Sequence, residues 1–290
     1  MTPADPQSRP VLGIIAGEGV FPILVARGAK RAGVRVVAIA LRGSAWEQLR
    51  DEVDVYRPVG LTRMSAWLGE LRRHNVTETI MVGRVRKVEL FKRFALLRYL
   101  PDLRTLRLFL KQMYRDKRDS TLLEGIANEL ARKGFPLSDS TKYCLEHLAT
   151  PEVMTRRQPT PQQWRDIRFG YQLATTISKL QIGQALAIAD QNVIAVEAIE
   201  GTDRMIERAG ELCRKGGWTL IKVANYKSDM RIDVPTVGEF TIEKLAKAGA
   251  KCLVLSPGKT IILEKPKVIE QADRAGICVV GYDGAEQRVE

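Results

Sequence analysis

Short apolar runs alternate with amphipathic stretches in the first half of the chain. Residues 11–16, 36–41 and 79–82 are apolar runs of the length expected for buried strands. Residues 21–32 and 64–74 show the spacing of helices with one apolar face. Strands that alternate with helices are typical of parallel sheets with right-handed crossovers, so we predict a parallel sheet here.

The second half has a different pattern. After a helix predicted over 162–180, apolar runs at 185–189 and 193–198 are separated by Asp190-Gln191-Asn192, which favours a hairpin. Further helices are predicted over 202–215, 240–248 and 266–275, and further strands over 219–224, 251–255, 260–263 and 277–281. This half therefore mixes antiparallel with parallel pairing, and the chain as a whole is predicted to be α/β.

Length and composition favour a globular protein of two domains. The chain has 290 residues, of which 45% are hydrophobic and 28% charged. We expect a short tail over 1–10, an N-terminal domain over 11–149, a Pro- and Thr-rich linker over 150–161 and a C-terminal domain over 162–287.

Cysteine and histidine contents exclude several kinds of site. The four cysteines form no C-x-x-C pair, which argues against a zinc ribbon or a disulfide framework and favours a reducing cytoplasm. Because His74 and His147 are the only histidines, any metal site must rest mainly on oxygen ligands. No P-loop motif occurs, no apolar run approaches the roughly 18 residues of a membrane span, and the start lacks the order of a signal peptide.

Positive charge is concentrated in one stretch. Residues 84–118 contain 12 Lys and Arg against three acidic residues, which accounts for nine of the twelve net positive charges. Apolar residues recur at helical spacing on both sides of Pro101, so we predict two basic amphipathic helices. Such a surface suits anionic lipid headgroups, although a solvated basic face over an ordinary core is an equally good interpretation. Nucleic acid is disfavoured, because no nucleic-acid-binding motif accompanies the charge.

Gly17 and Gly19 follow the first predicted strand and precede the first predicted helix. Backbone N–H groups at such a helix start can bind a phosphate. The dinucleotide-binding fingerprint is incomplete, because Pro22 stands where its third glycine belongs. The turn is therefore either a phosphate contact or a tight structural turn.

The strongest local signal for chemistry is the D-M-R-I-D sequence at 229–233. If this segment is extended, Asp229, Arg231 and Asp233 lie on one face of a strand. The carboxylates can then hold Mg²⁺ while Arg231 neutralises a phosphoryl oxygen, as cleavage of a pyrophosphate requires. The alternative is a salt-bridged edge strand without chemistry.

A second acidic group comprises Glu197, Glu200 and Asp203, where a predicted strand passes into a helix. Loops at strand ends collect functional residues in α/β folds. Helix capping by Thr202, with Asp203 complementing the helix dipole, is the structural alternative. Capping alone leaves Glu197 and Glu200 unexplained.

Four motifs in consistent order resemble a known family. They are Gly13 to Gly19 followed by Pro22, Ile182-Gly183-Gln184, the segment from Val196 to Asp203, and the segment from Asp229 to Gly238. Over about residues 12–284 the chain is similar to the LpxI-type UDP-2,3-diacylglucosamine diphosphatases. The resemblance implies an N-terminal Rossmann-like domain, a C-terminal α/β domain, and hydrolysis of UDP-2,3-diacylglucosamine to UMP and 2,3-diacylglucosamine 1-phosphate (lipid X) in lipid A biosynthesis.

The resemblance also implies Mg²⁺ as cofactor, with water attacking the α-phosphorus and an essential aspartate at Asp233. The expected catalytic residues are Asp233, Arg231 and Lys222. The expected metal ligands are Asp233, Asp229, Glu200 and Asp203. The expected substrate contacts are Gly17, Gly19, Gly183, Gln184, Gly201, Thr202 and Lys227, although Lys222 and Lys227 could equally be solvated.

The expected partners are a lipid-linked UDP-sugar and an anionic membrane surface, with no nucleic acid, and a homo-oligomer is left open. The protein would be cytoplasmic and peripheral on the inner face of the inner membrane, with Lys92, Arg93 and Arg98 of the basic stretch meeting the lipid. The chain departs from the family pattern at 225–228, which reads N-Y-K-S where members commonly have Lys-Pro and then Gln. A noncatalytic sensor of a nucleotide-sugar lipid and a hydrolase of another nucleotide-linked lipid are therefore the alternatives.

Overall fold

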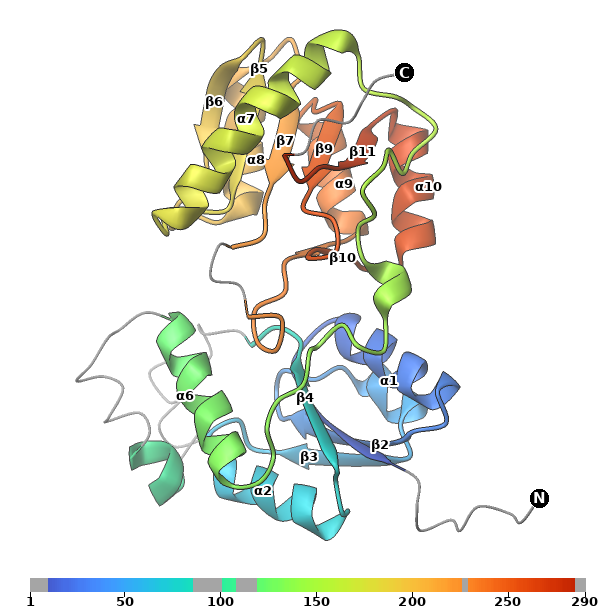
Figure 1. Cartoon of the computed structure of the whole chain (residues 1–290), viewed down its shortest axis with the longest axis vertical. Coiled ribbons are helices and arrows are strands. Elements are labelled where there is room, and N and C mark those ends of the chain that lie inside the picture. Colours follow the sequence, from blue (N-terminus) through green and yellow to red (C-terminus); the bar gives the residue numbers. More distant parts are fainter. Residues whose placement is uncertain (1–9, 86–100, 108–118, 226–228, 285–290) are drawn as a thin grey trace. The chain divides into compact units, whose positions relative to one another are not determined.

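The computed structural model describes residues 10–85, 101–107, 119–225 and 229–284, which form two compact units (Figure 1). Unit 1 comprises residues 1–144 and 230–232, and unit 2 comprises residues 145–229 and 233–290. Within the described ranges, none of the helices combines the length and the apolar character that crossing a bilayer requires.

Unit 1 contains a four-stranded parallel sheet in the order β3-β2-β1-β4. Its strands are β1 (Val11–Ala16), β2 (Arg35–Leu41), β3 (Val55–Val59) and β4 (Glu78–Val82). Its helices are α1 (Phe21–Arg31), the 3₁₀ helix η2 (Glu47–Glu52), α2 (Met64–Arg73) and α6 (Asp119–Arg132). The predicted parallel sheet is confirmed, and β1 is buried along its whole length because it lies inside the sheet.

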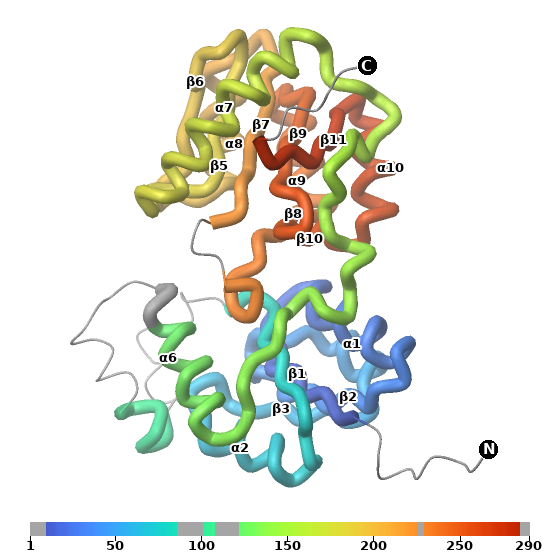
Figure 2. The backbone as a smooth tube through the Cα atoms, viewed as in Figure 1, coloured from blue at the N-terminus to red at the C-terminus, as the bar shows by residue number. Residues whose placement is uncertain are grey.

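Unit 2 contains a five-stranded mixed sheet in the order β11-β9-β7-β5-β6. Its strands are β5 (Ala185–Ala189), β6 (Asn192–Val196), β7 (Thr219–Lys222), β9 (Cys252–Leu255) and β11 (Cys278–Gly281). The last three are parallel, whereas β5 runs antiparallel to both β6 and β7. Figure 2 shows how segments distant in sequence, from yellow β5 to red β11, meet in this sheet. The mixed pairing predicted for this half is confirmed.

The remaining elements of unit 2 complete its core. They are η3 (Leu145–His147), α7 (Pro161–Lys179), α8 (Thr202–Leu212), β8 (Thr236–Val237), α9 (Glu239–Lys247), β10 (Ile261–Ile262) and α10 (Lys265–Ala275). Helix α7 begins with a reciprocal cap, in which the Thr160 hydroxyl accepts the Gln163 N–H and the Gln163 side chain accepts the Thr160 N–H. Residues from α8, α9 and α10 pack with β5, β7 and β9 in one apolar cluster.

The segment predicted as a linker, residues 150–161, belongs to unit 2. The Met154 N–H donates to the Val279 carbonyl at 2.8 Å, and the Gly281 N–H donates to the Glu152 carbonyl at 2.9 Å. A Cβ on Gly281 would lie only 1.8 Å from the Thr150 carbonyl oxygen, so only glycine allows this approach. The segment is therefore packed along β11.

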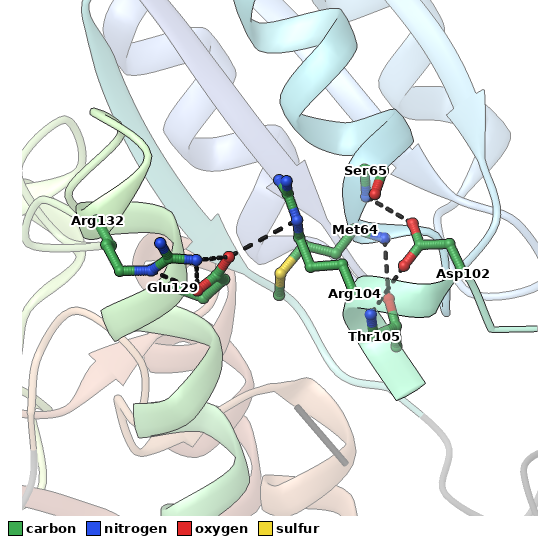
Figure 3. Close-up of polar contacts among 7 residues, drawn as sticks. All are labelled: Met64, Ser65, Asp102, Arg104, Thr105, Glu129 and Arg132. Carbon is green, nitrogen blue, oxygen red and sulfur yellow. Dashed lines mark hydrogen bonds and ion pairs between the residues drawn. The ribbon is translucent and has the colours of Figure 1, made fainter. Parts of the chain in front are cut away.

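The predicted basic helices lie mostly outside the described residues, which include only 84–85 and 101–107 of this stretch. Residues 103–107 are helical and contact the start of α2 (Figure 3). The Asp102 carboxylate accepts the backbone N–H groups of Ser65 at 2.7 Å and Thr105 at 2.8 Å, and the Thr105 hydroxyl accepts the Met64 N–H at 3.2 Å. One aspartate thus helps to cap two helices, although α2 has no cap of its own.

Candidate functional site

The glycine turn of unit 1 lies at the point where the strand order reverses. From β1 the chain continues to β2 and β3 on one side of the sheet, and β4 then pairs with the other side of β1. Ligands of open α/β sheets bind outside the carboxyl ends of the strands at such a point. The predicted residues Gly17 and Gly19 therefore occupy a position typical of binding sites.

Gly17 and Gly19 each require a glycine, but for different reasons. A Cβ on Gly17 would lie 2.7 Å from the Arg84 carbonyl oxygen and 2.8 Å from Gly83, because the turn pairs with the end of β4. Gly19 has φ of 109°, and a Cβ there would meet nothing within 4 Å. Gly17 thus allows a close approach of two backbones, whereas Gly19 supplies a left-handed conformation beside open space at the start of α1.

In unit 2, five strands bring polar residues to one edge of the sheet. The carboxyl ends of β6, β7, β9 and β11 lie at the same edge as the amino end of β5, because β5 alone runs in the opposite direction. Four candidate residues lie here, namely Gly183, Gln184, Glu197 and Lys222. The sheet thus brings together two of the motifs that carried the family resemblance.

Glu197 connects these motifs. Its side chain is 7% exposed, and its carboxylate accepts the Gln184 N–H at 3.2 Å and the Thr202 hydroxyl at 2.7 Å. A Cβ on Gly183 would lie 2.0 Å from the Glu197 carbonyl oxygen, so only glycine fits beside this strand end. The sequence singled out Glu197 among the acidic residues but did not predict that it would hold Gln184 and Thr202 together.

The expected metal ligands Glu200 and Asp203 both have cationic partners. Arg208 donates to Glu200 at 2.6 Å, and Lys244 lies 3.8 Å from the Asp203 carboxylate. Hydrogen bonds, first from its own backbone and then from Arg208, hold the pKa of the Glu200 carboxyl below its ordinary value. Both carboxylates therefore take part in ion pairs on and around α8.

The expectation that Thr202 caps α8 is wrong. The cap position is Gly201, with φ of 81°, and no side chain accepts a hydrogen bond there. Thr202 is the first helical residue, and its hydroxyl donates to Glu197 instead. A Cβ on Gly201 would meet nothing within 4 Å, so the backbone conformation of this residue, and not a lack of space, requires glycine.

The expectation that residues 229–233 are extended is also wrong. Residues 230–232 form a turn, and the Asp233 N–H donates to the Asp229 carbonyl at 2.9 Å. Ser140 holds this turn, because its N–H donates to the Met230 carbonyl at 2.9 Å and its hydroxyl donates to the Arg231 carbonyl at 3.0 Å. A turn, and not strand periodicity, therefore sets the spacing of Asp229, Arg231 and Asp233.

Lys222 and Asp233 interact electrostatically. Lys222 ends β7 as a buried residue, and its ammonium group lies 3.4 Å from the Thr236 carbonyl. Desolvation raises the pKa of the Asp233 carboxyl above its ordinary value, and the positive charge of Lys222 opposes this rise. Asp233 is exposed as a whole residue, while its carboxyl group is partly desolvated.

No group of three or more His, Cys, Asp or Glu side chains with metal-binding geometry occurs within the described ranges. Asp229 and Asp233 are two acidic residues at the ends of a single turn. Mg²⁺ is commonly bound by one or two carboxylates together with substrate phosphates and water, so the type and number of these side chains match what the ion needs. Lys227 lies outside the described residues, as do Lys92, Arg93 and Arg98.

A polar and aromatic group at the same edge of unit 2 was not predicted. The Ala224 N–H donates to the buried Ser256 hydroxyl at 3.0 Å, and Tyr171 and Tyr282 pack edge to face with ring centroids 5.1 Å apart. Burial raises the pKa of the Tyr171 hydroxyl, which a hydrogen bond with Ser256 opposes. The pairing of β7, β9 and β11 and the packing of α7 on them bring these residues together, so no local sequence signal could have identified them.

Comparison with known proteins covers nearly the whole chain. Residues 11–147 match the family model of the LpxI N-terminal domain, and residues 150–280 match that of the LpxI C-terminal domain. The UDP-2,3-diacylglucosamine pyrophosphatase LpxI of Caulobacter vibrioides is 28% identical over 286 residues, which cover 95% of this chain and 99% of that protein.

Two solved structures that are similar to this chain are distant from it in sequence. Phosphoribosylglycinamide synthetase from Anaerococcus prevotii is 11% identical with a TM-score of 0.26, and 69% of this chain matches 34% of that one. The biotin carboxylase domain of the Hydrogenobacter thermophilus 2-oxoglutarate carboxylase is 13% identical with a TM-score of 0.26, and 70% of this chain matches 41% of that one. Likeness at this level carries no functional conclusion. The two domain matches, in order and over most of its length, show that this chain belongs to the LpxI family.

Proposed function

We propose that this protein hydrolyses the pyrophosphate of UDP-2,3-diacylglucosamine to UMP and 2,3-diacylglucosamine 1-phosphate. The observation that carries the proposal is the end-to-end similarity to the Caulobacter vibrioides pyrophosphatase, together with both LpxI domain matches. The protein would then be a phosphoanhydride hydrolase of lipid A biosynthesis that acts in the cytoplasm at the inner face of the inner membrane.

The reaction requires groups that offset negative charge on two phosphates. Cleavage of a phosphoanhydride by water depends on positioning and electrostatic stabilisation, because charge develops on the phosphoryl and leaving oxygens. Lys222 supplies a buried positive charge at the end of β7, and Arg231 supplies a guanidinium from the turn beside Asp233. These two cations are the proposed partners of the diphosphate.

Asp229 and Asp233 are the proposed ligands of a Mg²⁺ ion. When bound, this ion would neutralise phosphate oxygens and polarise the α-phosphorus toward attack by water. The raised pKa of Asp233 reflects a carboxylate that desolvation makes costly to ionise, and a cation beside it would remove that cost. Glu200 and Asp203 form ion pairs with Arg208 and Lys244, and their proposed role is structural, at α8.

The substrate contacts are proposed at the strand ends described above. Gln184 and Thr202 lie on either side of Glu197, and Gly201 leaves the start of α8 without a side chain. Gly19 leaves the start of α1 similarly open in unit 1. Helix starts of this kind favour anionic groups through their backbone N–H groups and dipole.

The test is release of UMP from UDP-2,3-diacylglucosamine dispersed in detergent. We expect turnover with Mg²⁺, loss of turnover with EDTA, and recovery when Mg²⁺ is restored in excess. Asp233→Asn should lower kcat about 100-fold or more, the scale seen when one electrostatic contact to a transition state is removed. Asp190→Asn is the matched control, because this exposed aspartate pairs with Lys215 at the hairpin turn and should leave turnover unchanged.

Two outcomes would contradict the proposal. Folded protein that binds the substrate but releases no UMP at high enzyme concentration would indicate a noncatalytic sensor. Release of nucleotide only from another nucleotide-linked lipid would assign a different substrate, and residues 225–228, where the chain departs from the family pattern, would then be the first place to examine.

A further inference from the structure

The loop between β6 and α8, residues 197–201, is braced on both sides. On the β5 side, the Glu197 N–H donates to the Ala185 carbonyl at 2.9 Å, and the Glu197 carboxylate accepts from Gln184 and Thr202. The buried position of Glu197 makes these bonds costly to break, because an unpaired buried carboxylate has a large desolvation penalty.

A second set of bonds braces the other side of the loop. The Ala198 N–H donates to the Glu200 carboxylate at 3.1 Å, and Arg208 on α8 donates both to Glu200 at 2.6 Å and to the Val196 carbonyl at 2.9 Å. The loop is thus held to β5, to β6 and to α8. Its conformation is fixed by polar contacts and not by burial of apolar side chains.

Between these braces stands Ile199, whose accessible surface is 104% of the reference value. Ordering a loop costs conformational entropy, and an aliphatic side chain that stays in water contributes no hydrophobic stabilisation to offset it. Packing therefore does not explain why an isoleucine occupies this position. A rigid loop that holds an aliphatic side chain fully in solvent is suited to meet an apolar partner.

Two more exposed aliphatic residues lie on the neighbouring segment. Leu180 and Ile182 are 65% and 50% exposed, and they precede Gly183, whose backbone is in contact with that of Glu197. The antiparallel pairing of β5 with β6 continues through the Glu197–Ala185 hydrogen bond, so this segment runs beside the loop. Leu180, Ile182 and Ile199 together are called here the aliphatic corner.

The size and charge of the aliphatic corner indicate its partner. Three side chains offer on the order of a few hundred Å², less than the roughly 800 Å² per partner of a standard protein interface. Exposed basic residues, Lys179 and Arg204, flank the corner on the two segments, and the acidic residues between Ile199 and Arg204, Glu200 and Asp203, pair with Arg208 and Lys244. Aliphatic side chains beside basic ones are typical of surfaces that enter the boundary of an anionic bilayer.

We propose that the aliphatic corner inserts into the surface of a membrane that contains anionic phospholipids. The proposal rests on the proposed function, because a diacylated substrate resides in a bilayer and must be reached there. Ile182 and Ile199 adjoin Gln184 and Thr202, the proposed substrate contacts, so insertion would bring the candidate site of unit 2 to the lipid surface. This contact is distinct from the basic stretch at 84–118.

The test is cosedimentation of the full-length protein with vesicles of phosphatidylethanolamine and phosphatidylglycerol, without substrate. Measurement at about 0.5 M NaCl screens electrostatic attraction by the basic stretch and leaves the apolar contribution. Ile199→Glu should weaken vesicle binding by at least about tenfold, since full burial of an isoleucine corresponds to that factor or more. Ile199→Leu should bind as the unsubstituted protein does.

Leu212→Glu is the matched control, because Leu212 is 64% exposed at the opposite end of α8. It should bind vesicles within about twofold of the unsubstituted protein, and Ile199→Glu should keep the same unfolding midpoint because the Ile199 side chain is fully exposed. Equal binding by Ile199→Glu and the unsubstituted protein, or equal losses in both glutamate variants, would overturn the proposal.

Vesicle binding and hydrolysis are measured separately, so the two proposals can fail independently. Ile199-dependent binding by a protein that releases no UMP would support the membrane contact and contradict only the proposed function. Lower turnover of detergent-dispersed substrate by Ile199→Glu, with vesicle binding unchanged, would place the acyl chains of the substrate on the corner and overturn the membrane contact.

Discussion

Asp166 on α7 is the residue on which the β5–β6 hairpin most depends. Its buried carboxylate accepts the backbone N–H groups of Asp190 at 3.2 Å and Gln191 at 2.7 Å, and an amide N–H of Gln162 at 3.2 Å. Asp190 and Gln191 have φ of 50° and 58°, a left-handed conformation that costs a non-glycine residue about 1–2 kcal/mol. The carboxylate offsets this cost.

Asp166→Ala removes the carboxylate that accepts all three hydrogen bonds. A hydrogen bond to a charged group contributes about 1.5–3 kcal/mol. Because Asp190 and Gln191 are exposed, water can replace the lost partner of each N–H, and the lower end of that range applies. The two backbone bonds then give an expected loss of about 3 kcal/mol in the free energy of unfolding of unit 2. Asp166→Asn, which keeps the shape and one acceptor oxygen, should lose about half as much.

The assay combines urea denaturation with hydrogen exchange at the backbone amides of residues 190 and 191. Both amides should exchange faster in Asp166→Ala, while amides of the unit 1 sheet should be unaffected. Adding Gln191→Gly should recover about 1 kcal/mol, because glycine adopts φ of 58° without strain. A destabilisation below about 1 kcal/mol, or unchanged exchange at both amides, would refute the reasoning.

Two further predictions concern unit 1. Gly17→Ala should destabilise the protein by about 3 kcal/mol and Gly19→Ala by about 1 kcal/mol, since the first creates a 2.7 Å backbone contact and the second only strains a positive φ; equal midpoints in urea would contradict this. Burial raises the pKa of Asp102, but hydrogen bonds from Thr105 and Ser65 outweigh it and hold the pKa below its ordinary value of 3.8. A carboxyl whose pKa is lower in the folded state contributes stability above its ordinary pKa, and this contribution is lost as the pH falls through the folded-state pKa. Asp102→Asn should therefore destabilise the protein at pH 7 and progressively less below about pH 4. A difference in stability that does not change with pH would argue against this explanation.

Much of the fold could be predicted from the sequence because its strands are buried on both faces and appear as plain apolar runs. Two strands were missed, β3 and the two-residue β8. Strand β3 reads V-Y-R-P-V, lies at the edge of its sheet and is mostly half-exposed. Pro58 and Arg57 make such a segment look like a loop, and proline is tolerated there because an edge strand has unpaired N–H positions. An edge strand of this composition can therefore be predicted only when the strand that it pairs with is known.

The candidate site was predicted less well, because tertiary contacts override local pattern there. Alternating charges at 229–233 look like a strand, yet Ser140 binds the carbonyl groups of Met230 and Arg231, and Ile232 packs against the core of unit 1. These contacts join residues about 90 positions apart and leave no local signal. The position of Glu197 between Gln184 and Thr202 depends in the same way on the register of β5 with β6.

The three residues 230–232 also constrain how members of this family can exchange domains. They lie within the C-terminal family match, residues 150–280, but they are part of the compact unit formed by the N-terminal sequence. A hybrid made by joining two relatives between residues 147 and 150 would bring a foreign turn to Ser140 and a foreign side chain in place of Ile232 to the unit 1 core. Successful recombination should therefore require that this tripeptide be inherited with the N-terminal half.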